Sequence, residues 1–230
     1  MMTYIKQNLS DVQAELENAA AAVGRTSPCT VLAAVKYAVP GELQALLDAG
    51  VTDVGENRVQ QLLENAPLYA ERGTRVHFIG TLQTNKVKYI VDKVDVIHSL
   101  DSDRLAHEIE KRAAACGRVI DVLVEINMAR EEAKTGIAPE EAETLCRTVL
   151  QCPHLHLCGF MTMGPVMECE QDYRRYFAET KSFGSALWQR LSLPDQPLYS
   201  MGMSQSFAAA VKEGADFVRV GRRLFVGRPE

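Results

Sequence analysis

Residues 30–40, TVLAAVKYAVP, are the stretch from which the fold of this chain can be worked out. The run is apolar and prone to form a β-strand, it ends in one lysine, and a proline and a helix-like segment follow. Burial of a lysine at the carboxyl end of a strand favours the neutral amine, which is the form that attacks an aldehyde. Lys36 is therefore a Schiff-base candidate, unless it simply leaves the strand and extends its charge into water.

Strand and helix patterns alternate through the rest of the chain. Apolar residues at helical spacing over 3–23 predict an amphipathic helix before the first strand. Eight strand patterns follow, at 31–35, 53–55, 76–80, 94–98, 119–127, 155–161, 198–202 and 217–221. Helical patterns lie between them, at about 40–49, 57–71, 84–92, 102–115, 139–150, 168–190 and 204–213.

The order of these elements predicts parallel strands joined by right-handed crossovers. A count of eight favours a single (β/α)8 TIM barrel over residues 1–230, with an extra N-terminal helix, because such barrels commonly take roughly 200 to 250 residues. An open doubly wound sheet is the alternative fold. No GxGxxG motif follows the first strand to support a dinucleotide site in such a sheet.

Composition narrows the classes of function. Hydrophobic residues make up 47% of the chain and charged residues 24%, as in an ordinary globular protein with a full core. A net charge of −5 without a Lys/Arg-rich run argues against nucleic-acid binding. No signal-peptide pattern or membrane-spanning run is visible, so we expect a cytoplasmic protein whose six cysteines, none in a CxxC pair, are reduced thiols.

Polar and special residues at the carboxyl ends of the strands are the candidates for function, because active sites of such barrels lie on that face. They include Asn57 after the second strand, Met161 at the end of the sixth and Ser200 in the seventh. Ser204 is predicted to cap the next helix, whose free N–H groups would bind an anion unless the serine is only a cap. Gly221 permits close backbone approach, and the loops after strands seven and eight customarily bind phosphate.

A phosphate in these loops would lie beside Lys36, since the first and eighth strands are neighbours in a closed barrel. The two groups would hold a phosphorylated aldehyde by both ends, and pyridoxal 5′-phosphate has that shape. Arg219 shares the strand face of Gly221 and can point toward the ring. Arginine is not a proton acceptor near neutral pH, so it would leave the pyridine nitrogen unprotonated and the ring a weaker electron sink. Alternatively, Arg219 pairs with a carboxylate at the barrel rim.

A second pattern resembles a metal site. In the segment 152–158, apolar residues alternate with Cys152, His154, His156 and Cys158. A straight strand would place these four side chains on one side, where they superficially resemble a set of zinc ligands. Such positions are about 6 to 7 Å apart along a strand and cannot all converge on one ion. We therefore predict no metal site.

Several stretches, read together, resemble the pyridoxal-phosphate homeostasis protein family (the YggS/PROSC type), which is related to the barrel domain of alanine racemase. The matching stretches are AAVKYAVP around Lys36, VGENRVQQL at 54–62, HFIGTLQTNK at 77–86, IHSLDS at 97–102, INMAREEAKTG at 126–136, GFMTM at 159–163 and YSMGMSQSFAAAVKEGADFVRVG at 199–221. The resemblance implies a single barrel that holds pyridoxal 5′-phosphate as an internal aldimine on Lys36.

The resemblance also implies the roles of other residues. Asn57 would lie near the ring, Arg219 at the pyridine nitrogen, and Ser204, Gly221 and the backbone of Arg222 at the phosphate. Family members typically have threonine where this chain has Arg222, which puts a side-chain hydroxyl contact to phosphate in doubt and leaves the backbone N–H. The usual FG near the end is replaced by Phe-Val-Gly at 225–227, so the C-terminal turn is expected to shift.

We predict a monomeric carrier or regulator of intracellular pyridoxal phosphate, with no catalytic residue assigned and with apo-forms of enzymes that use this cofactor as candidate recipients. The alternative is a racemase of low efficiency, with Lys36 as one base and Tyr37 or a residue of 81–86 as the other. A barrel of this length leaves no room for the second, all-β domain of alanine racemase, which argues against that alternative. A third class, a barrel enzyme that binds sugar phosphates without the cofactor, would be colourless.

Overall fold

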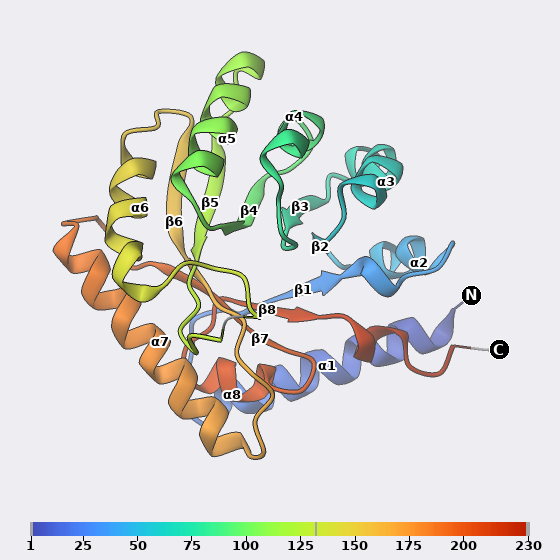
Figure 1. Ribbon diagram of the computed structural model, residues 1–230. Helices are drawn as coiled ribbons and strands as arrows, with labels where there is room; N and C mark the ends of the chain where they lie inside the picture. The colour runs from blue at the N-terminus through green and yellow to red at the C-terminus, as the bar shows by residue number, and fades with distance from the viewer. Residues whose placement is uncertain (1, 132, 229–230) are drawn as a thin grey trace.

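The computed structural model describes residues 2–131 and 133–228, and within them eight parallel strands form a closed barrel (Figure 1). Each strand pairs with the next along the chain, and β8 pairs with β1. The strands are β1 (Thr30–Ala34), β2 (Asp53–Glu56), β3 (Arg75–Phe78), β4 (Val96–Leu100), β5 (Ile120–Glu125), β6 (Leu155–Met161), β7 (Leu198–Met203) and β8 (Phe217–Val220). The predicted (β/α)8 barrel is confirmed, and the open sheet is wrong.

Helices surround the barrel in chain order. They are α1 (Thr3–Ala21), α2 (Glu42–Asp48), α3 (Val59–Arg72), α4 (Val87–Ile90), α5 (Asp103–Cys116), α6 (Ala142–Leu150), α7 (Glu170–Arg190) and α8 (Phe207–Lys212). Short 3₁₀ helices add η1 (Val35–Tyr37), η2 (Thr84–Lys86), η3 (Pro139–Glu141) and η4 (Arg222–Phe225). The one-domain prediction extends to residues 1, 132, 229 and 230, which lie outside the described residues.

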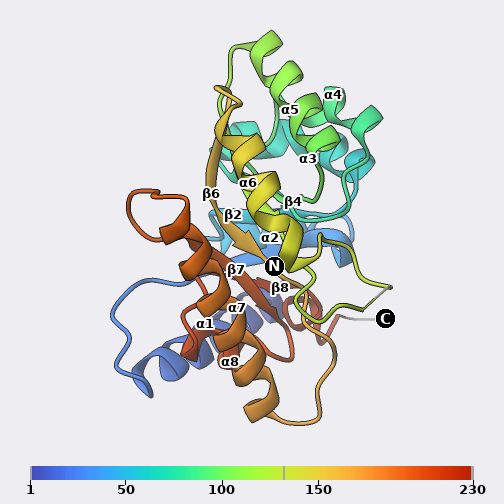
Figure 2. The same cartoon turned by 60° about the vertical axis from the view of Figure 1, so that its left-hand side comes forward.

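The N-terminal helix α1 completes the ring of helices. It packs against α8 on one side and α2 on the other, and Figures 1 and 2 both show it alongside α8. After β8 the described chain forms only η4, so α1 covers the seam between β8 and β1 that a helix after the eighth strand would otherwise cover. Its buried face consists of Ile5, Leu9, Val12, Leu16 and Ala19.

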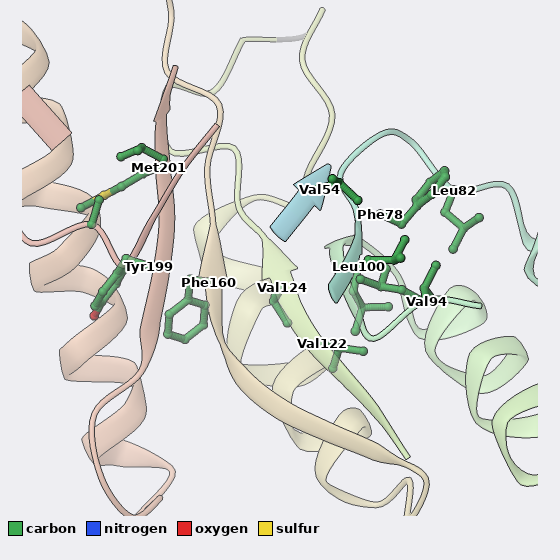
Figure 3. Close-up of a cluster of buried hydrophobic side chains, with 14 of the residues drawn as sticks. Val54, Phe78, Leu82, Val94, Leu100, Val122, Val124, Phe160, Tyr199 and Met201 are labelled. Carbon is green, nitrogen blue, oxygen red and sulfur yellow. The ribbon is translucent and has the colours of Figure 1, made fainter. Parts of the chain in front are cut away.

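The main core lies between the outer face of the barrel and the helices (Figure 3). Phe160 of β6, for example, is 1% exposed and meets Trp188 of α7 edge-to-face, with ring centroids 6.0 Å apart. Inside the barrel the apolar filling is smaller and includes Leu123 and Met161, and polar side chains occupy much of the remaining space. Among the described helices, none combines the length and the apolar character needed to cross a lipid bilayer.

Replacement of Leu9 by alanine should lower the free energy of unfolding by about 2 to 5 kcal/mol, because it opens a cavity beneath α1. Chemical denaturation followed by circular dichroism measures this loss. Leu150→Ala is the matched control, since Leu150 is 46% exposed and its truncation should cost less than about 1 kcal/mol. Equal stability of the two variants would contradict the covering role of α1.

Candidate functional site

Lys36 lies in η1, the single turn that directly follows β1 at the carboxyl end of the barrel. Val35 before it is fully buried, whereas Lys36 itself is exposed and its Nζ lies 5.1 Å from the ring centroid of Tyr37. Of the two interpretations of Lys36 that the sequence left open, the structure shows the one in which the side chain extends into water, because the chain turns away from the strand one residue before it. The amine is open to molecules in solution.

Ser204 and Gly221 come together beside this turn. Val220 pairs with Ala33 across the seam of the barrel, so Gly221 lies next to Ala34. A Cβ atom at position 221 would lie 3.1 Å from the carbonyl oxygen of Ala34, which leaves little room for any side chain there. The hydroxyl oxygen of Ser204 accepts a hydrogen bond from the backbone N–H of Gly221 at 3.3 Å. The loops after β7 and β8 therefore meet next to Lys36, as predicted.

The helix cap predicted at Ser204 is wrong. Residues 204–206 form a turn, and α8 begins only at Phe207, with Ser206 in the capping position. The Ser206 hydroxyl accepts a hydrogen bond from the N–H of Met203 at 3.1 Å, which closes this turn. Ser204 consequently faces the loop after β8 rather than the end of a helix.

Arg219 points into the barrel and is 5% exposed. Its Nη1 donates to the carbonyl oxygen of Ser200 at 2.7 Å and to the Ser200 hydroxyl at 2.8 Å, and its Nη2 donates to the carbonyl oxygen of Thr162 at 2.9 Å. The alternative of an ion pair at the rim is not found within residues 2–131 and 133–228. Burial lowers the pKa of Arg219 to about 10, and the Glu125 carboxylate opposes this shift, so the guanidinium remains charged at neutral pH.

The remaining predicted residues lie at different depths. Met161 is buried inside the barrel and is in register with Ser200 of β7. Asn57 follows β2, and its buried Oδ1 has no hydrogen-bond partner among the described residues. Arg222 begins η4 and its side chain is exposed. The structure thus joins Met161 and Ser200 to Arg219 in one group, while Arg222 can contribute to the same end of the barrel through its backbone.

A chain of buried hydrogen bonds extends from Arg219 to the other end of the barrel. The Ser200 hydroxyl lies 2.9 Å from Nδ1 of His98, Nε2 of His98 lies 2.8 Å from Nδ1 of His77, and Nε2 of His77 lies 2.9 Å from Oδ1 of Asp53. Both histidines are fully buried, and Asp53 stands at the start of β2, whereas Arg219 lies near the end of β8. The chain therefore spans the inside of the barrel from one end to the other.

The pKa shifts fix the direction of these hydrogen bonds. Burial lowers the pKa of His77 and lowers that of His98 well below its usual value, so both rings are neutral at pH 7. Burial alone would raise the pKa of Asp53, but hydrogen bonds from His77 and Thr52 outweigh it and lower that pKa. Asp53 then accepts from His77, His77 from His98, His98 from Ser200, and Ser200 from Arg219.

Reasoning from the sequence gave His77, His98 and Asp53 no role in the site, although His98 was among the polar residues at the end of the fourth predicted strand. The candidates were sought at the carboxyl ends of strands, whereas His77 lies inside β3 and Asp53 opens β2. A usable signal was present, since a histidine in each of two successive strands is unusual for barrel positions otherwise filled by apolar residues. Glu125, whose carboxylate accepts from the Thr135 hydroxyl near Arg219, was also not assigned.

Comparisons with known proteins place this geometry in a class. The family model for the N-terminal domain of alanine racemase matches residues 8–229. Alanine racemase of Clostridium difficile 630 superposes with a TM-score of 0.74 at 16% identity and covers 100% of this chain and 58% of the racemase, a likeness that shows the fold alone. The fold and the site together define a barrel of the alanine racemase N-terminal class.

Relatives with higher sequence identity to this chain show which family within the class it belongs to. A protein of Aquifex aeolicus (strain VF5), named pyridoxal phosphate homeostasis protein, is 39% identical over 220 residues, which cover 95% of this chain and 96% of the relative. PipY of Synechococcus elongatus PCC7942, solved with PLP bound, has a TM-score of 0.83 at 25% identity and covers 96% of this chain and 99% of its own. The chain belongs to the pyridoxal phosphate homeostasis protein family, and the resemblance seen in the sequence is confirmed.

The neutral state of His98 should make stability depend on pH. The pKa of His98 is lower in the folded protein than in the unfolded chain, so the unfolded chain binds the extra proton and the contribution of neutral His98 is lost as pH falls through about 6.5. Between pH 7 and pH 5.5 the wild type should lose about 1 kcal/mol more unfolding free energy than His98→Gln.

Urea denaturation at a series of pH values measures this difference. The profile of His98→Gln is subtracted from that of the wild type, which removes the contribution of buried carboxylates such as Glu125. Burial raises the pKa of Glu125, so its effect on the pH dependence of stability has the opposite sign to that of His98. His107→Gln is the matched control, because His107 is exposed on α5, and it should retain the wild-type profile. Parallel profiles for wild type and His98→Gln would contradict the assignment of a neutral buried ring.

Proposed function

We propose that this chain holds pyridoxal 5′-phosphate as an internal aldimine on Lys36 and serves in the homeostasis and delivery of that cofactor. Lys36 would anchor the aldehyde carbon, while Ser204, Gly221 and the backbone N–H of Arg222 would bind the phosphate. Arg219 would lie at the pyridine nitrogen. The observation that carries the proposal is the meeting of Ser204 and Gly221 directly beside the turn that bears Lys36.

Features of the described residues fit such a ligand. Position 221 has little room for a side chain, and without one a phosphate can approach its backbone closely. The hydrogen bonds of Arg219 use Nη1 and Nη2, and none from Nε is found in the described part of the chain, which leaves this N–H for a ring acceptor. Asn57 offers a buried amide oxygen without a partner, which a ligand donor could satisfy.

The relatives support the same ligand. The Aquifex aeolicus relative carries the name pyridoxal phosphate homeostasis protein, and the PipY structure was solved with PLP bound. The bound cofactor would supply an aldehyde that is reversibly captured by an amine and a ring that can withdraw electrons. The residues of this chain would bind it, orient its ring and leave its aldehyde end accessible.

Two observations favour a carrier over a catalyst of demanding reactions. Arg219 stays cationic at neutral pH and can only donate, so it would keep the ring nitrogen unprotonated and limit electron withdrawal. Lys36 is exposed, so an amine from solution or from a recipient apo-enzyme can reach the carbon that Lys36 holds and replace it. We also propose that the protein is a monomer and lies in the cytoplasm. Size-exclusion chromatography with light scattering tests the monomeric state.

Purified protein with added pyridoxal phosphate should show an absorption band in the near-ultraviolet to blue range that borohydride removes, with the pyridoxyl mass on Lys36. Lys36→Ala should lose the band and the mass label, because it removes the amine that lies beside the Ser204–Gly221 loops. Lys111→Ala is the matched control, since Lys111 is an exposed lysine on α5, in the outer ring of helices. If the pyridoxyl mass were found on another residue in Lys36→Ala, with the absorption band retained, the assignment of Lys36 as the anchoring lysine would be overturned.

Delivery and turnover can be separated in solution. Loaded protein should restore activity to an apo-enzyme that uses this cofactor at least as fast as an equal concentration of free cofactor, because Lys36 is open to exchange. Slower restoration would contradict delivery while leaving the bound cofactor intact. In parallel, sustained loss of optical purity of alanine or serine that disappears in Lys36→Ala would replace the carrier by a racemase.

A further inference from the structure

We propose that Asp121, His156 and Cys158 form a binding site for a zinc-class divalent metal ion at the amino-terminal end of the barrel, the end opposite Lys36. The Nδ1 atom of His156 lies 2.9 Å from Oδ1 of Asp121 and 3.3 Å from Sγ of Cys158. All three potential ligand atoms lie within 4.8 Å of one another. This site is independent of the proposed cofactor function.

The arrangement depends on a β-bulge that the sequence alone did not reveal. Residues two apart on a regular strand are too far from each other to share an ion. In β6, however, Leu157 pairs with Val122 and Gly159 pairs with Leu123, so Cys158 is an extra residue with no partner on β5. A bulge of this kind turns its side chain out of the regular alternation. Here it brings the Cys158 sulfur to the ring of His156.

The third ligand comes from the neighbouring strand. Asp121 of β5 is in register with His156 of β6, so their side chains lie side by side. Arg75 binds the other carboxylate oxygen of Asp121, Oδ2, at 2.8 Å and leaves Oδ1 directed at the ring of His156. A carboxylate that is already oriented by a second residue is typical of metal ligands.

The chemistry of the three groups suits zinc. Thiolate, imidazole and carboxylate are the ligand types that zinc uses, at about 2.0 to 2.3 Å from the ion. Tetrahedral geometry with those lengths separates ligand atoms by about 3.3 to 3.6 Å, so the two spacings from Nδ1 of His156 need to widen by only a few tenths of an ångström. The His156 side chain is 66% exposed, which gives an ion access and leaves room for water as the fourth ligand.

The other two members of the Cys-His-His-Cys pattern are engaged elsewhere. Nδ1 of His154 lies 2.8 Å from a carboxylate oxygen of Glu110, and the thiol of Cys152 donates to the carbonyl oxygen of Thr148 at 3.4 Å. The reason for rejecting a four-ligand site on one strand therefore holds. Of the four residues in the pattern, His156 and Cys158 belong to the proposed metal site, whereas Cys152 and His154 provide matched controls.

The test is a titration of the full-length protein, reduced and stripped of metal, with Zn²⁺ by calorimetry and with Co²⁺ by visible absorption. We expect one ion per chain and the cobalt bands of a four-coordinate site with a thiolate ligand, in the red part of the spectrum and away from any cofactor band. The thiol proton of Cys158 passes to solvent as the metal binds.

Matched variants decide the outcome. His156→Gln and Cys158→Ser should each weaken Zn²⁺ binding by at least about 10-fold, and Arg75→Gln by roughly 10-fold through loss of carboxylate orientation. His154→Gln and Cys152→Ser should bind as the wild type does. His156→Gln changes an exposed side chain, so its result does not depend on tolerance of a change in the partly buried Cys158. Failure to bind one ion, or equal affinity in His156→Gln and His154→Gln, would overturn the site.

Discussion

Arg219 carries a positive charge into the interior of the barrel, where a cation without hydrogen-bond acceptors would be strongly destabilising. The acceptors come from other strands: the carbonyl of Thr162 after β6 and two oxygens of Ser200 in β7. The Ser200 hydroxyl in turn donates a hydrogen bond to His98 of β4, and His98 donates one to His77 of β3. One buried guanidinium thus determines which polar side chains the inner face of the barrel must carry.

Closure of the barrel at the β8–β1 seam gives the candidate site its geometry. Lys36 and Gly221 are separated by most of the chain, and only the pairing of β8 with β1 makes them neighbours. No α-helix follows β8 in the described residues, so α1 protects the seam with an apolar face. The stability of this N-terminal helix and the integrity of the Ser204–Gly221 loops are therefore linked through the same pair of strands.

The sequence predicted the fold well because alternating periodicities are local properties of the chain. The adjacency of Lys36, Ser204 and Gly221 was predictable for a related reason, since it follows from the strand order alone once the barrel closes. The sequence left open whether Lys36 is buried or exposed, because its exposure depends on the chain leaving β1 at Val35. The start of α8 at Phe207 was missed because a serine suits the turn before a helix as well as the cap.

Contacts across the interior were harder to predict than contacts along the rim. The partners of Arg219 lie in β7 and just after β6, and the hydrogen-bond chain that continues from Ser200 depends on register shifts such as those between β4 and β5 and between β7 and β8. The bulge at Cys158 belongs to the same category, since a single extra residue redirects one side chain. Neither feature has a signature in the spacing of residues along one segment.

The hydrogen-bond chain inside the barrel has a fixed polarity. Arginine can only donate and an ionised carboxylate can only accept, so Arg219 and Asp53 at the two ends dictate the orientation of every N–H and O–H bond between them. These bonds add head to tail, and each polarises the next. The barrel interior therefore carries a permanent electric dipole with its positive end at the mouth beside Lys36, and an anionic ligand entering there is drawn inward before any contact forms.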